Sequence, residues 1–139
     1  MKKAINILMV IAAVLSAAAF TCSCSKDLKD DNIPVIKEGY VRHVILWTLS
    51  EDLTEKEKLD VIMIAESAME TFVKEIPGLV KADVIYENRL DSSNCDFMFD
   101  MYFTGRDALE AFSVNPDHLA VVAQLKPYIT GRTCLDVEL

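Results

Sequence analysis

Residues 41–49, Val-Arg-His-Val-Ile-Leu-Trp-Thr-Leu, constrain the fold most, because they are apolar on both alternating faces. β-branched and aromatic residues dominate this segment, which favours a β-strand. His43, Ile45 and Trp47 would share one face of that strand. A strand that is apolar on both sides requires an interior place in a sheet covered on both faces. The sequence therefore predicts a sheet built around this strand.

Helical and extended patterns alternate after this first strand. Residues 54–57, Thr-Glu-Lys-Glu, form a capping-box motif and predict the start of a helix. Apolar residues then recur at three- and four-residue steps until Pro77-Gly78 ends the helix, which predicts one buried stripe. The stripe consists of Leu59, Ile62, Met63, Met69, Phe72, Val73 and Ile76. Two further strands are expected over residues 79–86 and 96–103.

The second half of the chain completes the pattern. A short helix is expected to end at Phe112, and Asn115-Pro116 predicts the start of another that reaches Leu125. Residues 130–138 predict a last strand. This order is that of an α+β, ferredoxin-like split βαβ fold with a four-stranded antiparallel sheet. One face of such a sheet stays open, which predicts a homodimer closed face to face as a dimeric α/β barrel.

The N-terminus has the pattern of an export signal. Two lysines precede an apolar run over residues 4–20, slightly shorter than the ~20 residues of a membrane span. The following Thr-Cys-Ser-Cys-Ser at 21–25 resembles a bacterial lipoprotein signal, in which a Cys after a small residue is acylated. Cys24, which follows a serine, is favoured for lipidation, and Cys22 remains an alternative. An ordinary cleaved signal or an uncleaved anchor would have a similar pattern.

These features predict three parts of the chain. Residues 1–23 form the lipoprotein signal peptide, residues 24–39 a polar flexible tether, and residues 40–139 the folded domain. The resemblance implies an exported lipoprotein of a Gram-negative bacterium, held at the outer membrane by its lipid, on either the periplasmic or the cell-surface side.

The composition argues against several partners. The formal charge is −8, from 14 basic and 22 acidic residues, which opposes binding to a phosphate backbone and so to nucleic acid. The four glycines form no phosphate-binding pattern, and no nucleophile-elbow motif is present. No cofactor is therefore expected.

Five short motifs follow one another along the folded part. They are Arg42-His43-Val44-Ile45-Leu46, Ile76-Pro77-Gly78-Leu79, Asn115-Pro116-Asp117-His118, Leu125-Lys126-Pro127 and Leu135-Asp136. In this order and spacing the whole of residues 42–138 resembles the stress-responsive A/B barrel (Dabb) family. The resemblance implies a dimeric protein with a ferredoxin-like α+β fold.

The resemblance also implies a site. Plant polyketide cyclases that are similar to this domain close rings by aldol-type chemistry in a pocket between sheet and helices. His118 matches their catalytic base, Asp136 matches the acid that orients it, and His43 matches a histidine near the pocket. His118 would also lie in the first turn of a helix, where the dipole favours a neutral imidazole that can accept a proton.

The sequence departs from those cyclases at two pocket positions. Phe112 stands where the cyclases carry a tyrosine hydroxyl, and a phenyl ring donates no hydrogen bond. Ala65 supplies nothing polar from the first helix. Both are expected to line the pocket with His43, as is Trp47, which is interpreted mainly as a core residue.

Three functions remain open on these observations. The first is binding of a small apolar or aromatic molecule without chemistry. The second is a cofactor-independent cyclase, isomerase or monooxygenase with His118 as general base. The third is a non-catalytic dimerising scaffold.

Metal and thiol chemistry are not expected. The two histidines and Asp136 occur at long spacing in the sequence, so no metal site is predicted. Cys95 and Cys134 fall on the third and last strands, which the first strand separates in a ferredoxin-like sheet. They are therefore expected to be buried free thiols rather than a disulfide.

Overall fold

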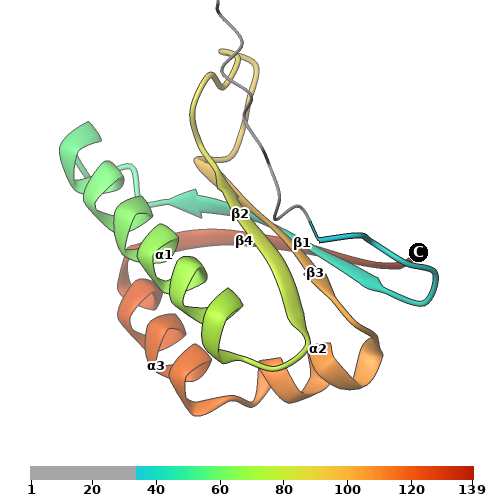
Figure 1. The fold of residues 1–139 in the computed structure, drawn as a ribbon. Coiled ribbons are helices and arrows are strands. Elements are labelled where there is room, and N and C mark those ends of the chain that lie inside the picture. The colour runs from blue at the N-terminus through green and yellow to red at the C-terminus, as the bar shows by residue number, and fades with distance from the viewer. Residues whose placement is uncertain (1–33) are drawn as a thin grey trace, which may run out of the picture. The chain divides into compact units, whose positions relative to one another are not determined.

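The structure, a computed structural model, describes residues 34–139 as a four-stranded antiparallel sheet with three α-helices (Figure 1). The elements are β1 (Val41–Leu49), α1 (Glu55–Glu75), β2 (Leu79–Ile85), β3 (Phe97–Phe103), α2 (Arg106–Ser113), α3 (Pro116–Leu125) and β4 (Ile129–Glu138). Their order confirms the predicted ferredoxin-like fold. The predicted signal peptide, Cys22, Cys24 and most of the tether lie outside the described residues.

The sheet has the strand order β2-β3-β1-β4, so β1 takes the interior position that its sequence predicts. The helices lie on one side of the sheet only (Figure 1). No described helix covers the other face of β1. The expected coverage of this strand on both faces is therefore not found within residues 34–139. Leu46, Leu135 and Val137 remain exposed there, by 36, 61 and 41%. An uncovered apolar surface of this kind is costly in water.

The two predicted helix starts are confirmed by their hydrogen bonds. The Thr54 hydroxyl accepts from the backbone N–H of Glu57, while the Glu57 carboxylate accepts from the N–H of Thr54, which completes the capping box. The Asn115 side chain accepts from the N–H groups of Asp117 and His118 at 2.9 and 3.3 Å. This cap fixes where α3 begins and therefore where the His118 side chain lies.

The buried stripe of α1 differs in part from the prediction. Val61, Ile62, Ala65, Met69 and Phe72 are buried. The predicted members Leu59 and Met63 are 45 and 47% exposed. The stripe keeps its helical period but is rotated, because the orientation of α1 on the sheet decides which apolar residues meet the core.

The turn between α1 and β2 brings α2 close to the first helix. Gly78 has φ +86°, a backbone conformation that side chains rarely adopt, and a Cβ there would lie 2.5 Å from that of Ala108 in α2. The absence of a side chain at Gly78 therefore allows α2 to pack against this turn. Leu109, Phe112 and Ser113 of α2 line the cavity described below.

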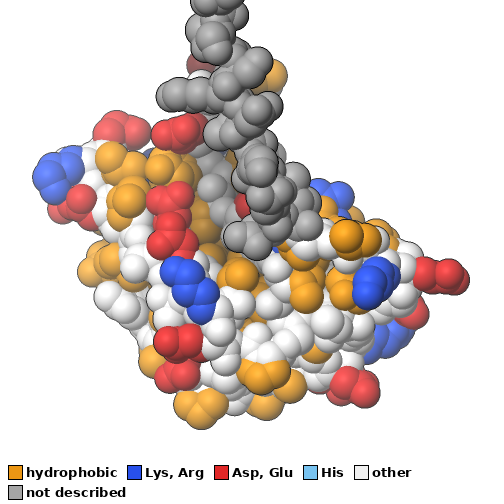
Figure 2. Space-filling model, in the orientation of Figure 1, with side chains coloured by type: hydrophobic (Ala, Val, Ile, Leu, Met, Phe, Trp, Pro, Cys, Tyr) orange, Lys and Arg blue, Asp and Glu red, His pale blue; other side chains and the backbone are white. Residues whose placement is uncertain are grey.

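The outer surface of α1 is charged. Figure 2 shows acidic and basic side chains along this helix, between smaller apolar areas. Among the residues that the structure describes, no helix is both long and apolar enough to cross a membrane.

Candidate functional site

A cavity of about 410 Å³ lies between the helix-covered face of the sheet and helices α2 and α3. Its walls include His43, Ile45 and Trp47 from β1 and Phe112, His118 and Val121 from the helices. Most of the wall is apolar, and its volume falls in the range of small-molecule sites. The cavity is therefore the first candidate for a binding site.

His118 contributes a buried polar atom to this cavity. Its Nδ1 has no hydrogen-bond partner among the described residues. Its ring packs on Phe112, with the ring centroids 4.3 Å apart and the planes inclined by 35°. Burial lowers the pKa of His118, the charges of His43 and Arg132 lower it further, and only the Ser113 carbonyl opposes this. The imidazole is therefore neutral at pH 7, and its Nδ1 is enclosed without a partner among the described residues.

Trp47 contributes a second buried polar atom. Its indole Nε1 is enclosed and has no acceptor among the described residues. The Arg132 guanidinium lies 5.6 Å from the centroid of the Trp47 ring. Buried polar groups normally have a partner, so each exception calls for an explanation. Trp47 and His118 line the same cavity.

The predicted pair of His118 with Asp136 is wrong. The Asp136 carboxylate instead accepts a hydrogen bond from Nδ1 of His43. The reason is the strand register, which places His43 directly opposite Asp136 in the β1–β4 ladder. Asp136 does not line the first cavity but a neighbouring one of about 560 Å³, and His43 borders both. The carboxylate therefore orients the imidazole of β1, not that of α3.

The expectation that Ala65 lines the pocket is also wrong. It is 0% exposed in the hydrophobic core and lines neither cavity. Its position on the buried stripe of α1 explains this, because that stripe packs directly onto the sheet. His43, Trp47 and Phe112 do line the first cavity. Their roles toward a ligand stay predictions.

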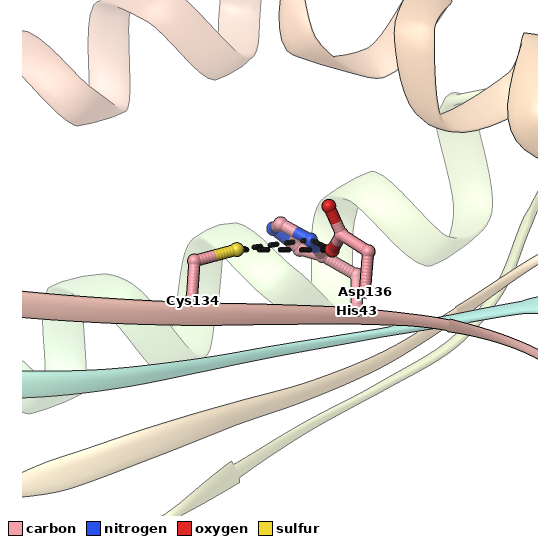
Figure 3. A group of neighbouring side chains, drawn as sticks. All are labelled: His43, Cys134 and Asp136. Atoms are coloured by element: carbon pink, nitrogen blue, oxygen red, sulfur yellow. Dashed lines mark hydrogen bonds and ion pairs between the residues drawn. The ribbon is translucent and has the colours of Figure 1, made fainter.

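Cys134 joins His43 and Asp136 in a cluster that the sequence analysis missed (Figure 3). Its Sγ lies 3.6 Å from His43 Nδ1 and donates a hydrogen bond to Asp136 Oδ1 at 3.7 Å. Partial burial, and then the Asp136 charge, raise the pKa of the thiol. The sequence feature that indicates this cluster is the Cys-x-Asp spacing on the last strand, because residues two apart on a strand share a face.

The two cysteines are free thiols, as predicted, but they are not buried. Cys134 is exposed, and Cys95 is only partly buried. Cys134 lies on β4, which forms the edge of the sheet, so only one neighbouring strand shields it.

The fold and cavity define a ferredoxin-like α+β protein with an apolar pocket between sheet and helices. The profile of the stress responsive A/B barrel domain family (Dabb) matches residues 41–139. The chain belongs to this family, as its five sequence motifs predict. No curated protein matches the sequence.

Several solved structures have a similar fold, and the similarity covers nearly the whole of their chains. A dimeric protein of unknown function from Bacteroides fragilis is 25% identical, with a TM-score of 0.68 over 75% of this chain and 100% of its own. A dimeric ferredoxin-like protein of unknown function from Thermobifida fusca is 22% identical, with a TM-score of 0.63 over 76% and 95%. A cofactor-independent oxygenase from Streptomyces nogalater is 15% identical, with a TM-score of 0.57 over 73% and 93%.

The lowered pKa of His118 predicts a pH dependence of stability. The unfolded chain, with a histidine pKa of 6.5, binds this proton more tightly than the folded protein does. The stability that depends on neutral His118 is therefore complete above this value and is lost as the pH falls toward the folded-state pKa. We expect the free energy of unfolding to fall more steeply between about pH 7.5 and 5.5 in the wild type than in His118→Gln.

Urea denaturation across this pH range measures the difference, and an NMR titration of the His118 ring gives its pKa directly. A titration midpoint at or above 6.5 would contradict the buried, neutral imidazole.

Proposed function

We propose that the domain binds a small apolar or aromatic molecule that carries one polar group. The observation that supports this is that Trp47 and His118, which both line one apolar cavity, each carry a buried nitrogen without a partner among the described residues, Nε1 and Nδ1 respectively. Leaving a buried donor or acceptor unpaired costs about 1–3 kcal/mol. A ligand that pairs with them recovers this free energy and also removes its own apolar surface from water.

The hydrogen-bonding properties of these two nitrogens indicate which polar group the ligand would carry. The indole N–H of Trp47 can only donate, whereas Nδ1 of a neutral His118 either donates or accepts. A hydroxyl group can pair with either atom, because its oxygen accepts from the indole N–H and its proton can bond to the imidazole. The burial that lowers the pKa of His118 also penalises a cationic ligand, and the nearby Arg132 charge repels one. A phenol-like compound therefore fits better than an amine.

We expect 2-naphthol to bind the protein at least about tenfold more tightly than naphthalene, because only the naphthol supplies the missing partners. The His118→Phe variant should reduce this preference. Val121→Trp, which fills the cavity, should abolish binding of both compounds. Val114→Trp is the matched control, since Val114 is 70% exposed and lies outside the cavity. Fluorescence titration measures each affinity.

Equal affinity for naphthol and naphthalene would contradict the polar part of the proposal. Unchanged binding in Val121→Trp would place the ligand elsewhere. If no aromatic probe binds, the proposed ligand class is wrong, and catalysis or a non-catalytic dimerising scaffold remains.

Cofactor-independent catalysis is the second candidate, and one observation favours it. The Asp136 carboxylate fixes the tautomer of His43, whose ring borders the ligand cavity. A carboxylate–imidazole pair of this kind can take a proton from a bound substrate. His118, neutral and without a carboxylate partner, is the other base, as the sequence suggests. Chromatography and NMR spectroscopy of carbonyl compounds recovered after incubation with the protein separate catalysis from binding. Only catalysis changes their covalent structure, and isomerisation or ring closure does so without a change of mass.

We infer that the protein forms a homodimer through the uncovered face of the sheet. Leu46, Leu135 and Val137 are exposed on that face, and the similar proteins from B. fragilis and T. fusca are described as dimeric. We expect Leu135→Glu to weaken the dimer at least about tenfold, because it would bury an unpaired charge. Leu90→Glu is the control, since Leu90 is 75% exposed in the loop before β3.

Sedimentation over a range of protein concentrations measures the change. A dimer of unchanged affinity in Leu135→Glu would place the interface elsewhere, and a monomeric wild type would rule the homodimer out.

We also propose that the domain is held at the outer membrane of a Gram-negative bacterium by a lipid on Cys24, after loss of residues 1–23. The support is the signal-like sequence, in which Ser23 precedes Cys24. Mass spectrometry of the N-terminal peptide should find an acylated Cys24, and Cys24→Ala should abolish the modification while Cys22→Ala leaves it. An unmodified N-terminus, or acylation of Cys22, would contradict the proposal.

A further inference from the structure

We propose that His43, Cys134 and Asp136 hold a zinc ion at the edge of the sheet, with one coordination position left open. The cluster lies between β1 and β4, and Figure 3 shows the three side chains on the same side of these two strands. Imidazole, thiolate and carboxylate are the three ligand types that Zn²⁺ takes in proteins. This inference is independent of the proposed aromatic ligand.

The distances between the ligand atoms fit tetrahedral zinc. His43 Nδ1, Cys134 Sγ and one carboxylate oxygen of Asp136 all lie within 4.8 Å of one another. Sulfur lies 3.6 Å from the nitrogen and 3.7 Å from the oxygen. Zinc bond lengths at tetrahedral angles give about 3.6 Å for both of these separations. Two edges of the coordination polyhedron are thus already formed.

The third edge requires a small movement. The nitrogen and oxygen share a hydrogen bond, whereas zinc would separate them by about 3.3 Å. The Asp136 side chain is 51% exposed, so its rotation meets little resistance. The metal would replace the proton that now lies between these atoms.

The way the three groups converge distinguishes a metal site from a proton relay. In a relay the nucleophile and the carboxylate bond opposite nitrogens of the imidazole. Here the thiol and the carboxylate both approach the same nitrogen, Nδ1 of His43. Three potential ligands that converge on one point suit a single cation.

The strands hold the ligands in place. His43 is buried on the interior strand β1, and Asp136 is its register partner on β4. Cys134 is paired with Ile45 in the same ladder and so shares the face. A metal site is more precise when its ligands come from paired strands than when they come from loops.

The surrounding charges permit a dication. The thiolate and the carboxylate together neutralise Zn²⁺, and Glu138 in the same cavity is already paired with Arg106 at 2.8 Å. Arg132, which lines the same cavity and also lies over the Trp47 ring, is the one nearby charge among the described residues of this cavity that opposes the metal without an acidic partner. The neighbouring cavity of about 560 Å³ gives access for the ion and for water at the open position.

Titration of the purified full chain with Co²⁺, a spectroscopic substitute for zinc, tests the site. Cys22 and Cys24 are replaced by serine in every variant, so that the chain offers only the thiols of Cys95 and Cys134. We expect one Co²⁺ per chain, with a thiolate-to-cobalt charge-transfer band that Zn²⁺ abolishes by displacement. Cys134→Ser should remove the band, and Asp136→Asn should weaken binding by more than about tenfold.

Cys95→Ser is the matched control and should keep both the band and the affinity. Circular dichroism of each variant verifies that it is folded. The proposal is overturned if no charge-transfer band forms, if the band persists in Cys134→Ser, if Cys95→Ser removes it, or if Asp136→Asn binds as tightly as the parent.

Discussion

The pairing of β4 with β1 is the interaction on which both cavities depend. The register places Asp136, Cys134 and Arg132 opposite His43, Ile45 and Trp47. Paired residues lie on the same face of a sheet, so all six side chains lie under the helices. A shift of one residue would move every side chain of β4 to the other face. The last strand thereby supplies charged and thiol groups to a face that is otherwise apolar.

The same pairing divides this face into two environments. Toward Trp47 the wall is apolar, and burial keeps His118 neutral. Toward Asp136 the wall carries charged groups and the Cys134 thiol. His43 borders both cavities, with its Nδ1 bonded to Asp136. A ligand in the first cavity and a cation in the second would therefore share one histidine.

Local sequence signals predicted most of the fold. The capping box at Thr54, the Asn115 cap and the strand over residues 41–49 depend on residues close in sequence, and all three are confirmed. The rotation of α1 was not predicted. Leu59 and Met63 are as apolar as the residues that are buried, and only the packing of the helix on the sheet separates them.

The site was predicted only in part, because its contacts are far apart in the sequence. His43, Trp47, Phe112 and His118 line one cavity, as expected. The partner of Asp136 depends on a strand register between residues 93 positions apart, which no local pattern encodes. The same register brings Cys134 close to His43, so the sequence alone predicts only a buried free thiol at this position.

Trp47 Nε1 is enclosed without a partner among the described residues, and Trp47 lines the first cavity, which we propose as the ligand site. The chain has one tryptophan, so its indole N–H gives a single, readily assigned signal in a proton–nitrogen NMR spectrum. Addition of 2-naphthol should move this signal downfield, as expected when a free N–H gains a hydrogen-bond acceptor. An indole signal that stays in place while 2-naphthol is bound would contradict the account.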